Sequence, residues 1–207
     1  MNSNFIIYYI HDPMCSWCWG FRPTWHKVLD ELNDKATIRY VLGGLAADTD
    51  QPMPDEMQVN IQEIWRLIQK EIPGTQFNLD FWKQCHPRRS TYASCRAIIS
   101  ATNQQSDIGN KMLLAIQQSY YLEAKNPSDD QVLIELAKQL NLNIEKFTTD
   151  LNSTETHKKL LEEFELRRRL DIQSFPSIVL EHNDSYTYID IDYNNADNIL
   201  KQINNIL

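Results

Sequence analysis

The beginning of the chain carries a strand–helix–strand pattern that constrains its fold more than any other feature. Phe5–Ile10 is a continuous apolar and aromatic run, typical of a strand buried on both faces. Thr37–Leu42 predicts a second strand. An amphipathic helix between them is indicated by apolar residues at i, i+3, i+4 and i+7, namely Trp25, Val28, Leu29 and Leu32. A unit of this length predicts parallel strands joined by a right-handed crossover.

Two more strands and a helix are expected near the end of the chain. Ser177–Glu181 and Tyr186–Ile191 are rich in β-branched and aromatic residues, and the turn-forming residues between them predict a hairpin. A final helix would carry Ile199 and Ile203 on one face.

The middle of the chain is almost wholly helical by pattern, because apolar residues recur there at helical spacing. The sequence therefore predicts an α/β fold in the order βαβ, helices, ββα. In this scheme residues 1–45 and 173–207 form one unit, and residues 46–172 form a large all-helical insertion.

Charge and hydropathy argue against several classes of partner. The net charge of -8 opposes general nucleic-acid binding, because neutralising phosphates needs a basic surface. The one basic run holds Arg167 and Arg169 four residues after Glu163 and Glu165, which predicts an ion-paired helix face. No apolar run is long enough to span a bilayer, and the N-terminus lacks a signal-peptide pattern. We therefore expect a cytoplasmic protein that binds neither nucleic acid nor membranes.

The chemistry is expected where the first strand gives way to the first helix, at Cys15-Ser16-Trp17-Cys18. A thiolate is the nucleophile in disulfide exchange, and the free N–H groups and partial positive charge of a helix N-terminus favour it. Two cysteines three positions apart on a helical turn can close and reopen a disulfide with little backbone movement. We expect Cys15 to be the nucleophile and Cys18, one turn further in, to resolve the mixed disulfide.

Two other interpretations of the pair compete with redox chemistry. A Cys-x-x-Cys can be half of a zinc site, but the remaining cysteines, Cys85 and Cys95, do not have the spacing of a second half. No metal site is predicted. An inert structural disulfide is rarely kept in a reducing compartment. A working redox pair is therefore the favoured interpretation.

Several other residues are expected to have structural roles. Trp25 matches the apolar stripe of the first helix, and Cys95 is expected to pack among helices. Ser90 or Thr91, and separately Ser128, precede helical stretches and are candidate N-caps.

The order of elements, the Cys-x-x-Cys after the first strand and a proline entering the third strand together resemble the thioredoxin superfamily. The long helical insertion resembles its DsbA-like branch. Residues 12–21, Asp-Pro-Met-Cys-Ser-Trp-Cys-Trp-Gly-Phe, are similar to the active-site segment of its cytoplasmic FrnE-like and predicted disulfide-isomerase members. Residues 174–177, Ser-Phe-Pro-Ser, resemble the cis-proline loop of the family. The resemblance implies a cis peptide bond before Pro176, with the backbone of Phe175 beside the Cys15 sulfur.

The resemblance also implies a substrate surface formed by Trp17, Phe175 and Pro176, with the Trp17 side chain facing solvent. Its substrate would be a cysteine-containing polypeptide or a small thiol. Family members usually carry a small or β-branched residue before the cis-proline, and Phe175 is larger.

A second departure concerns proton transfer. Many thioredoxins bury an acid in the strand before the motif, and Phe5–Ile10 contains none. Asp12, His11 or a water would then have to accept the proton of the resolving cysteine.

The function expected from these features is that of a thiol–disulfide oxidoreductase of the reductase or isomerase type. It would hold no bound cofactor and would use glutathione or another thiol as redox partner. One alternative is a glutathione-dependent transferase or isomerase of the kappa-class type, which needs only one serine or cysteine. Another is a polypeptide-binding chaperone or adaptor without turnover.

Overall fold

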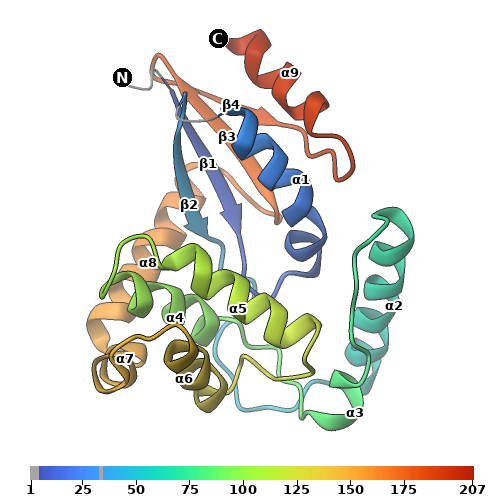
Figure 1. The fold of residues 1–207 in the computed structure, drawn as a ribbon, viewed down its shortest axis with the longest axis vertical. Coiled ribbons are helices and arrows are strands. Elements are labelled where there is room, and N and C mark those ends of the chain that lie inside the picture. The colour runs from blue at the N-terminus through green and yellow to red at the C-terminus, as the bar shows by residue number, and fades with distance from the viewer. Residues whose placement is uncertain (1–4, 33–34) are drawn as a thin grey trace.

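The computed structural model describes residues 5–32 and 35–207, and Figure 1 shows its sheet above a group of helices. The strands are β1 (Ile6–His11), β2 (Thr37–Leu42), β3 (Ser177–His182) and β4 (Ser185–Ile189). The helices are α1 (Ser16–Leu32), α2 (Asp55–Glu71), α3 (Phe81–Gln84), α4 (Tyr92–Thr102), α5 (Gly109–Tyr121), α6 (Asp130–Gln139), α7 (Ile144–Leu151), α8 (Thr154–Arg169) and α9 (Ala196–Ile206).

The sheet has the strand order β2-β1-β3-β4. β1 is parallel to β2 and antiparallel to β3, and β3 and β4 form the expected hairpin. As the second of four strands, β1 has neighbours on both sides, and its Ile7 and Ile10 side chains are fully buried. The thioredoxin-like α/β fold is therefore confirmed, with α2 to α8 lying between β2 and β3 in the chain.

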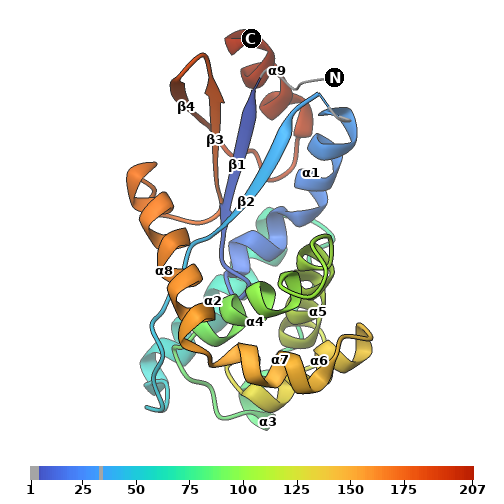
Figure 2. The ribbon, with the colours of Figure 1, turned by 90° about the vertical axis from the view of Figure 1, so that its left-hand side faces the viewer.

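Helices cover both faces of the sheet. Figure 1 shows α1 and α9 side by side against one face, where Val28 of α1 and Ile203 of α9 are buried against the sheet. The end of α8 packs on the other face, where Leu166 and Leu170 meet Val179 of β3. In Figure 2, α8 runs from the sheet down to the helical group, so it joins the two parts of the molecule.

The helical part has two cores of its own. One lies among α4, α5, α6 and α7, where Met112, Leu133 and Phe147 are fully buried. The other is an aromatic cluster around Trp65 of α2, whose ring stacks on Phe77 with centroids 4.9 Å apart. Such ring pairs add to the stabilisation from buried area.

Of the two predicted N-caps, Thr91 lies at the expected position and Ser128 does not, and neither side chain caps its helix. Thr91 does precede α4, but its hydroxyl makes no capping hydrogen bond. The residue before α6 is Asp129, and the Ser128 hydroxyl donates instead to the carbonyl of Ser90, at 2.7 Å. In both cases a tertiary partner replaces the local helix N–H that a capping side chain would bind.

The predicted ion-paired face of α8 is also wrong in its pairing. Glu163 accepts a hydrogen bond from the backbone N–H of Leu42, and Arg167 donates to the carbonyl of Gly43. Glu165 pairs with Arg168 rather than Arg169. Backbone groups at the end of β2 and just after it therefore bind the two side chains, Glu163 and Arg167, that helix spacing alone would pair with each other.

Candidate active site

Cys15 lies in the turn between the end of β1 and the start of α1. Its own N–H donates to the carbonyl of Asp12 at 3.1 Å. The N–H of Cys18 points back at the Cys15 sulfur at 3.4 Å. A backbone N–H aimed at the sulfur from the first turn of a helix stabilises negative charge there. All four cysteines of the chain carry free thiols, and 7% of the surface of residue Cys15 is exposed.

The loop before β3 meets Cys15 from the other side. The peptide bond between Phe175 and Pro176 is cis, as the resemblance implied. The Cys15 thiol donates to the carbonyl of Phe175, with sulfur and oxygen 3.5 Å apart. Residues 160 positions apart in the chain are thus brought together where β1 ends and β3 begins.

The large side chain of Phe175 is accommodated by a glycine. A Cβ placed on Gly43 would lie 2.3 Å from the Phe175 ring, so no other residue fits there without moving the ring. The guanidinium of Arg167 completes this corner, 6.0 Å from the centroid of the Phe175 ring. It donates to the Gly43 carbonyl at 2.6 Å. This role of Arg167 could not be predicted from the sequence, because Arg167 belongs to a run of three arginines.

Cys18 is more deeply buried than Cys15, with 1% of its surface exposed. Burial, and then the neighbouring Cys15 thiol, raise the pKa of Cys18 well above its usual value. The Cys18 thiol is therefore protonated at neutral pH. It borders a cavity of about 90 Å³ that is also lined by Arg22 and Gln117. A cavity of this size with polar walls can hold water.

Asp12 fastens the active-site turn to the helical part of the molecule. Its buried carboxylate accepts hydrogen bonds from the N–H groups of Met14 at 2.8 Å and Leu45 at 2.7 Å. The hydroxyl of Thr91 donates to it at 2.8 Å, and the thiol of Cys95 at 3.7 Å. Burial raises the pKa of Asp12, and these hydrogen bonds oppose that rise.

The sequence analysis named Asp12 as a candidate proton acceptor for the resolving cysteine. In the structure its carboxylate oxygens already accept hydrogen bonds from other groups. Its two partners Thr91 and Cys95 on the helical side were missed by the sequence analysis. Only the position of Asp12, before a proline and a turn, hinted at such a role, since aspartates often accept hydrogen bonds from N–H groups two residues on.

His11 is enclosed by rings. Its imidazole stacks on Tyr9 with centroids 5.3 Å apart and meets the Tyr40 ring edge-on. Burial, followed by the positive charge of Arg22, lowers the pKa of His11 to about 3. Its Nδ1 atom has no partner among the residues that the structure describes. The imidazole is therefore neutral at physiological pH.

Trp17 is half-buried rather than freely exposed, because its ring packs at 5.0 Å against Tyr193 before α9. Trp19 stacks on Tyr121 of α5, with centroids 5.6 Å apart. Trp25 is buried in the core, as predicted. The aromatic residues around the motif therefore tie α1 to its neighbours more than they form an open rim.

Within residues 5–32 and 35–207, no three His, Cys, Asp or Glu side chains are grouped so that they could hold a metal ion. Among the helices in these ranges, none is both long and apolar enough to cross a membrane.

Known proteins resemble this chain along most of its length. A family model described as Thioredoxin matches residues 8–201. The ClpXP adapter protein SpxH of Bacillus subtilis is 25% identical over 193 residues, which cover 88% of this chain and 63% of SpxH. The chain thus spans less than two thirds of the length of the curated relatives that it matches.

Solved structures share the fold. A candidate protein disulfide isomerase from Nitrosomonas europaea superimposes with a TM-score of 0.84 at 24% identity, over 98% of this chain and 97% of that one. The cytosolic disulfide reductase DsbM from Pseudomonas aeruginosa gives a TM-score of 0.79 at 21% identity, over 98% and 100%. The same reductase with GSH gives 0.76, also at 21% identity, over 98% and 100%.

Proposed function

This chain belongs to the thioredoxin family, and on that premise we propose that it is a thiol–disulfide oxidoreductase of the reductase or isomerase type. Cys15 is the nucleophile and Cys18 the resolving thiol. The observation that carries the proposal is the setting of the Cys15 sulfur, between the N–H of Cys18 at 3.4 Å and the carbonyl of Phe175 at 3.5 Å.

In the first step the Cys15 thiolate attacks one sulfur of a substrate disulfide. A new bond forms between Cys15 and that sulfur, the substrate S–S bond breaks, and the departing thiolate takes a proton from solvent. The Cys18 N–H stabilises the attacking thiolate. Only a small part of Cys15 is exposed, so the substrate must bring its sulfur to that surface.

In the second step Cys18 attacks the Cys15 sulfur, releases the substrate thiol and closes the Cys15–Cys18 disulfide. Because Cys18 is protonated at rest, its proton must first leave. Water in the adjoining cavity of about 90 Å³ is the relay that we assign for carrying this proton to solvent, since Asp12 is occupied by other donors. Two equivalents of glutathione or another thiol then reduce the pair and leave as their own disulfide.

The substrate is a cysteine-containing polypeptide or a small thiol, held beside Cys15 by the cis-proline loop. Pro176 has no N–H, so it leaves neighbouring backbone groups of the loop free to pair with an extended segment. Trp17 supplies apolar surface on the side of α1. A place in the cytosol is supported by the likeness to DsbM, a reductase described as cytosolic.

A second candidate function is supported by the relatives described as ClpXP adapters. An adapter binds other proteins and needs no disulfide exchange. The kappa-class alternative likewise needs only one of the two thiols. Retention of both Cys15 and Cys18 in an oxidoreductase geometry favours the first function over these two.

The test is to trap the covalent intermediate. Cys18→Ser should accumulate a mixed disulfide between Cys15 and a peptide that contains one disulfide, detected as an added mass after alkylation. Cys15→Ser should form none. As a matched control, Cys85→Ser in the Cys18→Ser background removes another partly exposed thiol and should leave the adduct unchanged.

Two outcomes would overturn the proposal. Failure of Cys18→Ser to form an adduct, with the variant folded, would favour a binding role without turnover. Glutathione transfer at the wild-type rate by Cys18→Ser would favour the kappa-class reaction.

A further inference from the structure

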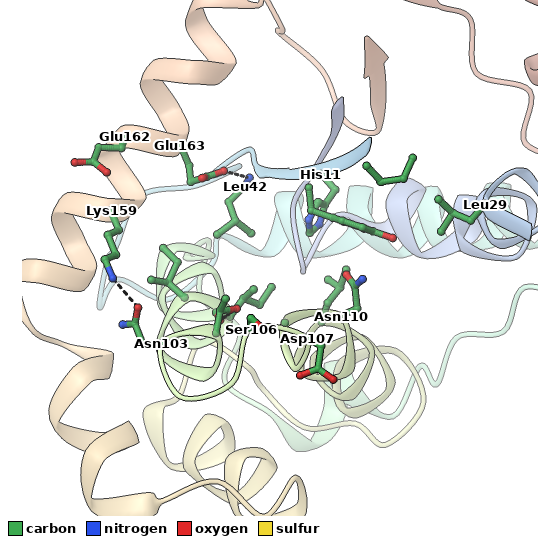
Figure 3. A pocket seen from close by; sticks show the side chains of 17 residues that line it. His11, Leu29, Leu42, Asn103, Ser106, Asp107, Asn110, Lys159, Glu162 and Glu163 are labelled. Carbon is green, nitrogen blue, oxygen red and sulfur yellow. Dashed lines mark hydrogen bonds between the residues drawn. The ribbon is translucent and has the colours of Figure 1, made fainter. Parts of the chain in front are cut away.

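A large cavity that Cys15 does not line lies between the edge of the sheet and the helices. It measures about 790 Å³, within the range of sites that bind ligands. Figure 3 shows its walls: Leu42 and His11 at the ends of β2 and β1, Leu29 of α1, Asn110 of α5 and Glu163 of α8. We call this space the β2 cleft. Neither Cys15, Cys18, Phe175 nor Pro176 lines it.

One wall of the β2 cleft is an open strand edge. β2 is the outermost strand of the sheet, and it pairs with β1 alone. Along a parallel strand, N–H and C=O groups point alternately toward and away from the neighbouring strand. The N–H groups of Thr37 and Gly43 donate to the carbonyls of Phe5, just before β1, and His11, so the backbone groups of the even-numbered residues between them point outward.

Those outward groups form a template for another strand. Glu163 accepts from the outward N–H of Leu42 at 3.1 Å, which shows that an acceptor within the cleft reaches this edge. Within the chain that the structure describes, no hydrogen bond is made by the outward backbone groups of Ile38 and Tyr40. An extended chain can satisfy such groups by adding a strand.

The side chains around the edge indicate what kind of segment would fit. Apolar surface comes from Leu29, Ile98 and Leu113. The charged groups are mainly acidic, namely Glu162 and Glu163 on α8 and Asp107 before α5.

The basic side chain in the cleft does not balance this charge. Lys159 is the cation that lines it among the described residues, and its Nζ donates to Asn103 at 2.6 Å. The cleft therefore carries a net negative charge beside an apolar floor, on a chain whose total charge is -8. Complementary potentials steer a partner to such a surface and select its charge.

We infer that the β2 cleft binds an extended polypeptide segment in which apolar residues alternate with lysine or arginine. The segment adds a strand along β2, places its apolar side chains over Leu29 and Leu113, and directs its cations to Glu162 and Glu163. Neither cysteine of the thiol pair lines this site, although Leu29 and Leu113 also border the small cavity beside Cys18, and the inference goes beyond the proposed redox reaction. A substrate or a partner protein could thus be held while its cysteine reacts elsewhere.

The test uses a cysteine-free probe. A fluorescein-labelled peptide of sequence Leu-Lys-Val-Lys-Leu-Lys should bind, measured by fluorescence anisotropy, with a Kd that rises with salt. The charge-reversed peptide Leu-Glu-Val-Glu-Leu-Glu should bind at least about tenfold more weakly, because like charges then face each other. A Cys15→Ser/Cys18→Ser variant should bind the basic peptide as the wild type does.

Two variants locate the binding. Glu162→Lys should weaken binding of the basic peptide by about tenfold, a loss of about 1.4 kcal/mol, and leave thiol exchange unchanged. Glu135→Lys makes the same charge change on the exposed face of α6, outside the cleft, and should change the Kd by less than about twofold. Ile38→Pro removes an outward N–H that makes no hydrogen bond to β1. It should weaken the binding of both peptides.

The inference is overturned if both peptides bind equally, if Glu162→Lys and Glu135→Lys have equal effects, or if no binding is detected. Loss of binding in the double cysteine variant would also overturn it, because the peptide would then occupy the thiol site. These outcomes are independent of mixed-disulfide trapping by Cys18→Ser, so failure of one proposal does not imply failure of the other.

Discussion

The thioredoxin-like unit and the inserted helices contribute to the same site by different means. The unit surrounds Cys15 with main-chain groups, the N–H of Cys18 and the carbonyl of Phe175. The helices contribute side chains, because Thr91 and Cys95 donate to Asp12. Main-chain contacts follow from the fold, whereas side-chain contacts can be removed one at a time. We therefore expect variants in the unit to change reactivity and variants at the junction to change stability.

The largest effect is expected at the nucleophile. Cys15→Ser should lower the rate of disulfide reduction by at least about a thousandfold, because a serine hydroxyl is not ionised at neutral pH. The measurement is turnover of a fluorescent peptide disulfide with glutathione as reductant. Cys95→Ser, on the helical side, should retain most of the activity. Equal losses of activity in Cys15→Ser and Cys95→Ser would contradict the expectation that variants in the thioredoxin-like unit, and not those at the junction, change reactivity.

The next largest effect is expected at the junction itself. Asp12→Ala removes the acceptor of two buried N–H groups and of the Thr91 hydroxyl. Leaving these donors unpaired should lower the free energy of unfolding by about 3–5 kcal/mol, measured by urea denaturation. The exposed Asp30→Ala on α1 is the control and should change it by less than about 0.5 kcal/mol. A loss as small as that of the control would show that the Asp12 bonds contribute no stability.

A pH-dependent effect is expected from His11. Its pKa in the folded protein, about 3, lies below the usual 6.5, so the unfolded chain takes up the proton first as the pH falls. The contribution of His11 to the free energy of unfolding therefore has its full value above pH 6.5 and declines as the pH falls toward 3. At pH 5 the loss is about 2 kcal/mol.

His11→Phe isolates this contribution, because it keeps a ring against Tyr9 and removes the titration. The buried Asp12, whose raised pKa acts in the opposite direction, is the same in both proteins. The variant should therefore lose less stability than the wild type between pH 8 and pH 5, by urea unfolding at each pH. Parallel pH profiles would contradict the assignment.

The smallest effect is expected at Thr91. Thr91→Val keeps the shape of the side chain and removes two hydrogen bonds, the one that the hydroxyl donates to Asp12 and the one that it accepts from the N–H of Ala46. It should cost about 1 kcal/mol of unfolding free energy, since Asp12 keeps its two backbone donors. Combined with Asp12→Ala, the Thr91 change should cost less than it does alone in a double-mutant cycle, and the remaining cost is that of the unpaired Ala46 N–H. Additive losses would mean that the two residues do not act together.

The sequence was informative wherever a local pattern decides the outcome. Phe5–Ile10 and Thr37–Leu42 lie within one residue of β1 and β2, and the motifs at Cys15 and Pro176 are brought together as the resemblance implied. These features depend on hydrophobic periodicity and on a helix beginning at a known position.

Contacts between distant segments could not be read in the same way. Thr91 and Asp12 are 79 positions apart, and only the packed fold makes the threonine hydroxyl prefer that carboxylate to a helix cap. Glu163 likewise bonds to the backbone of Leu42 instead of to Arg167. At both places a partner distant in sequence replaces the neighbour that helix spacing predicts. Both places lie where the helices contact the sheet unit.

The most direct test of the central claim is a redox titration of the purified protein in glutathione buffers, with the state of the Cys15–Cys18 pair measured by alkylation and mass spectrometry. We predict one reversible two-electron transition assigned to Cys15 and Cys18, while Cys85 and Cys95 remain thiols throughout. A pair that stays in one state across the whole range of buffers would contradict the assignment of this chain as an oxidoreductase.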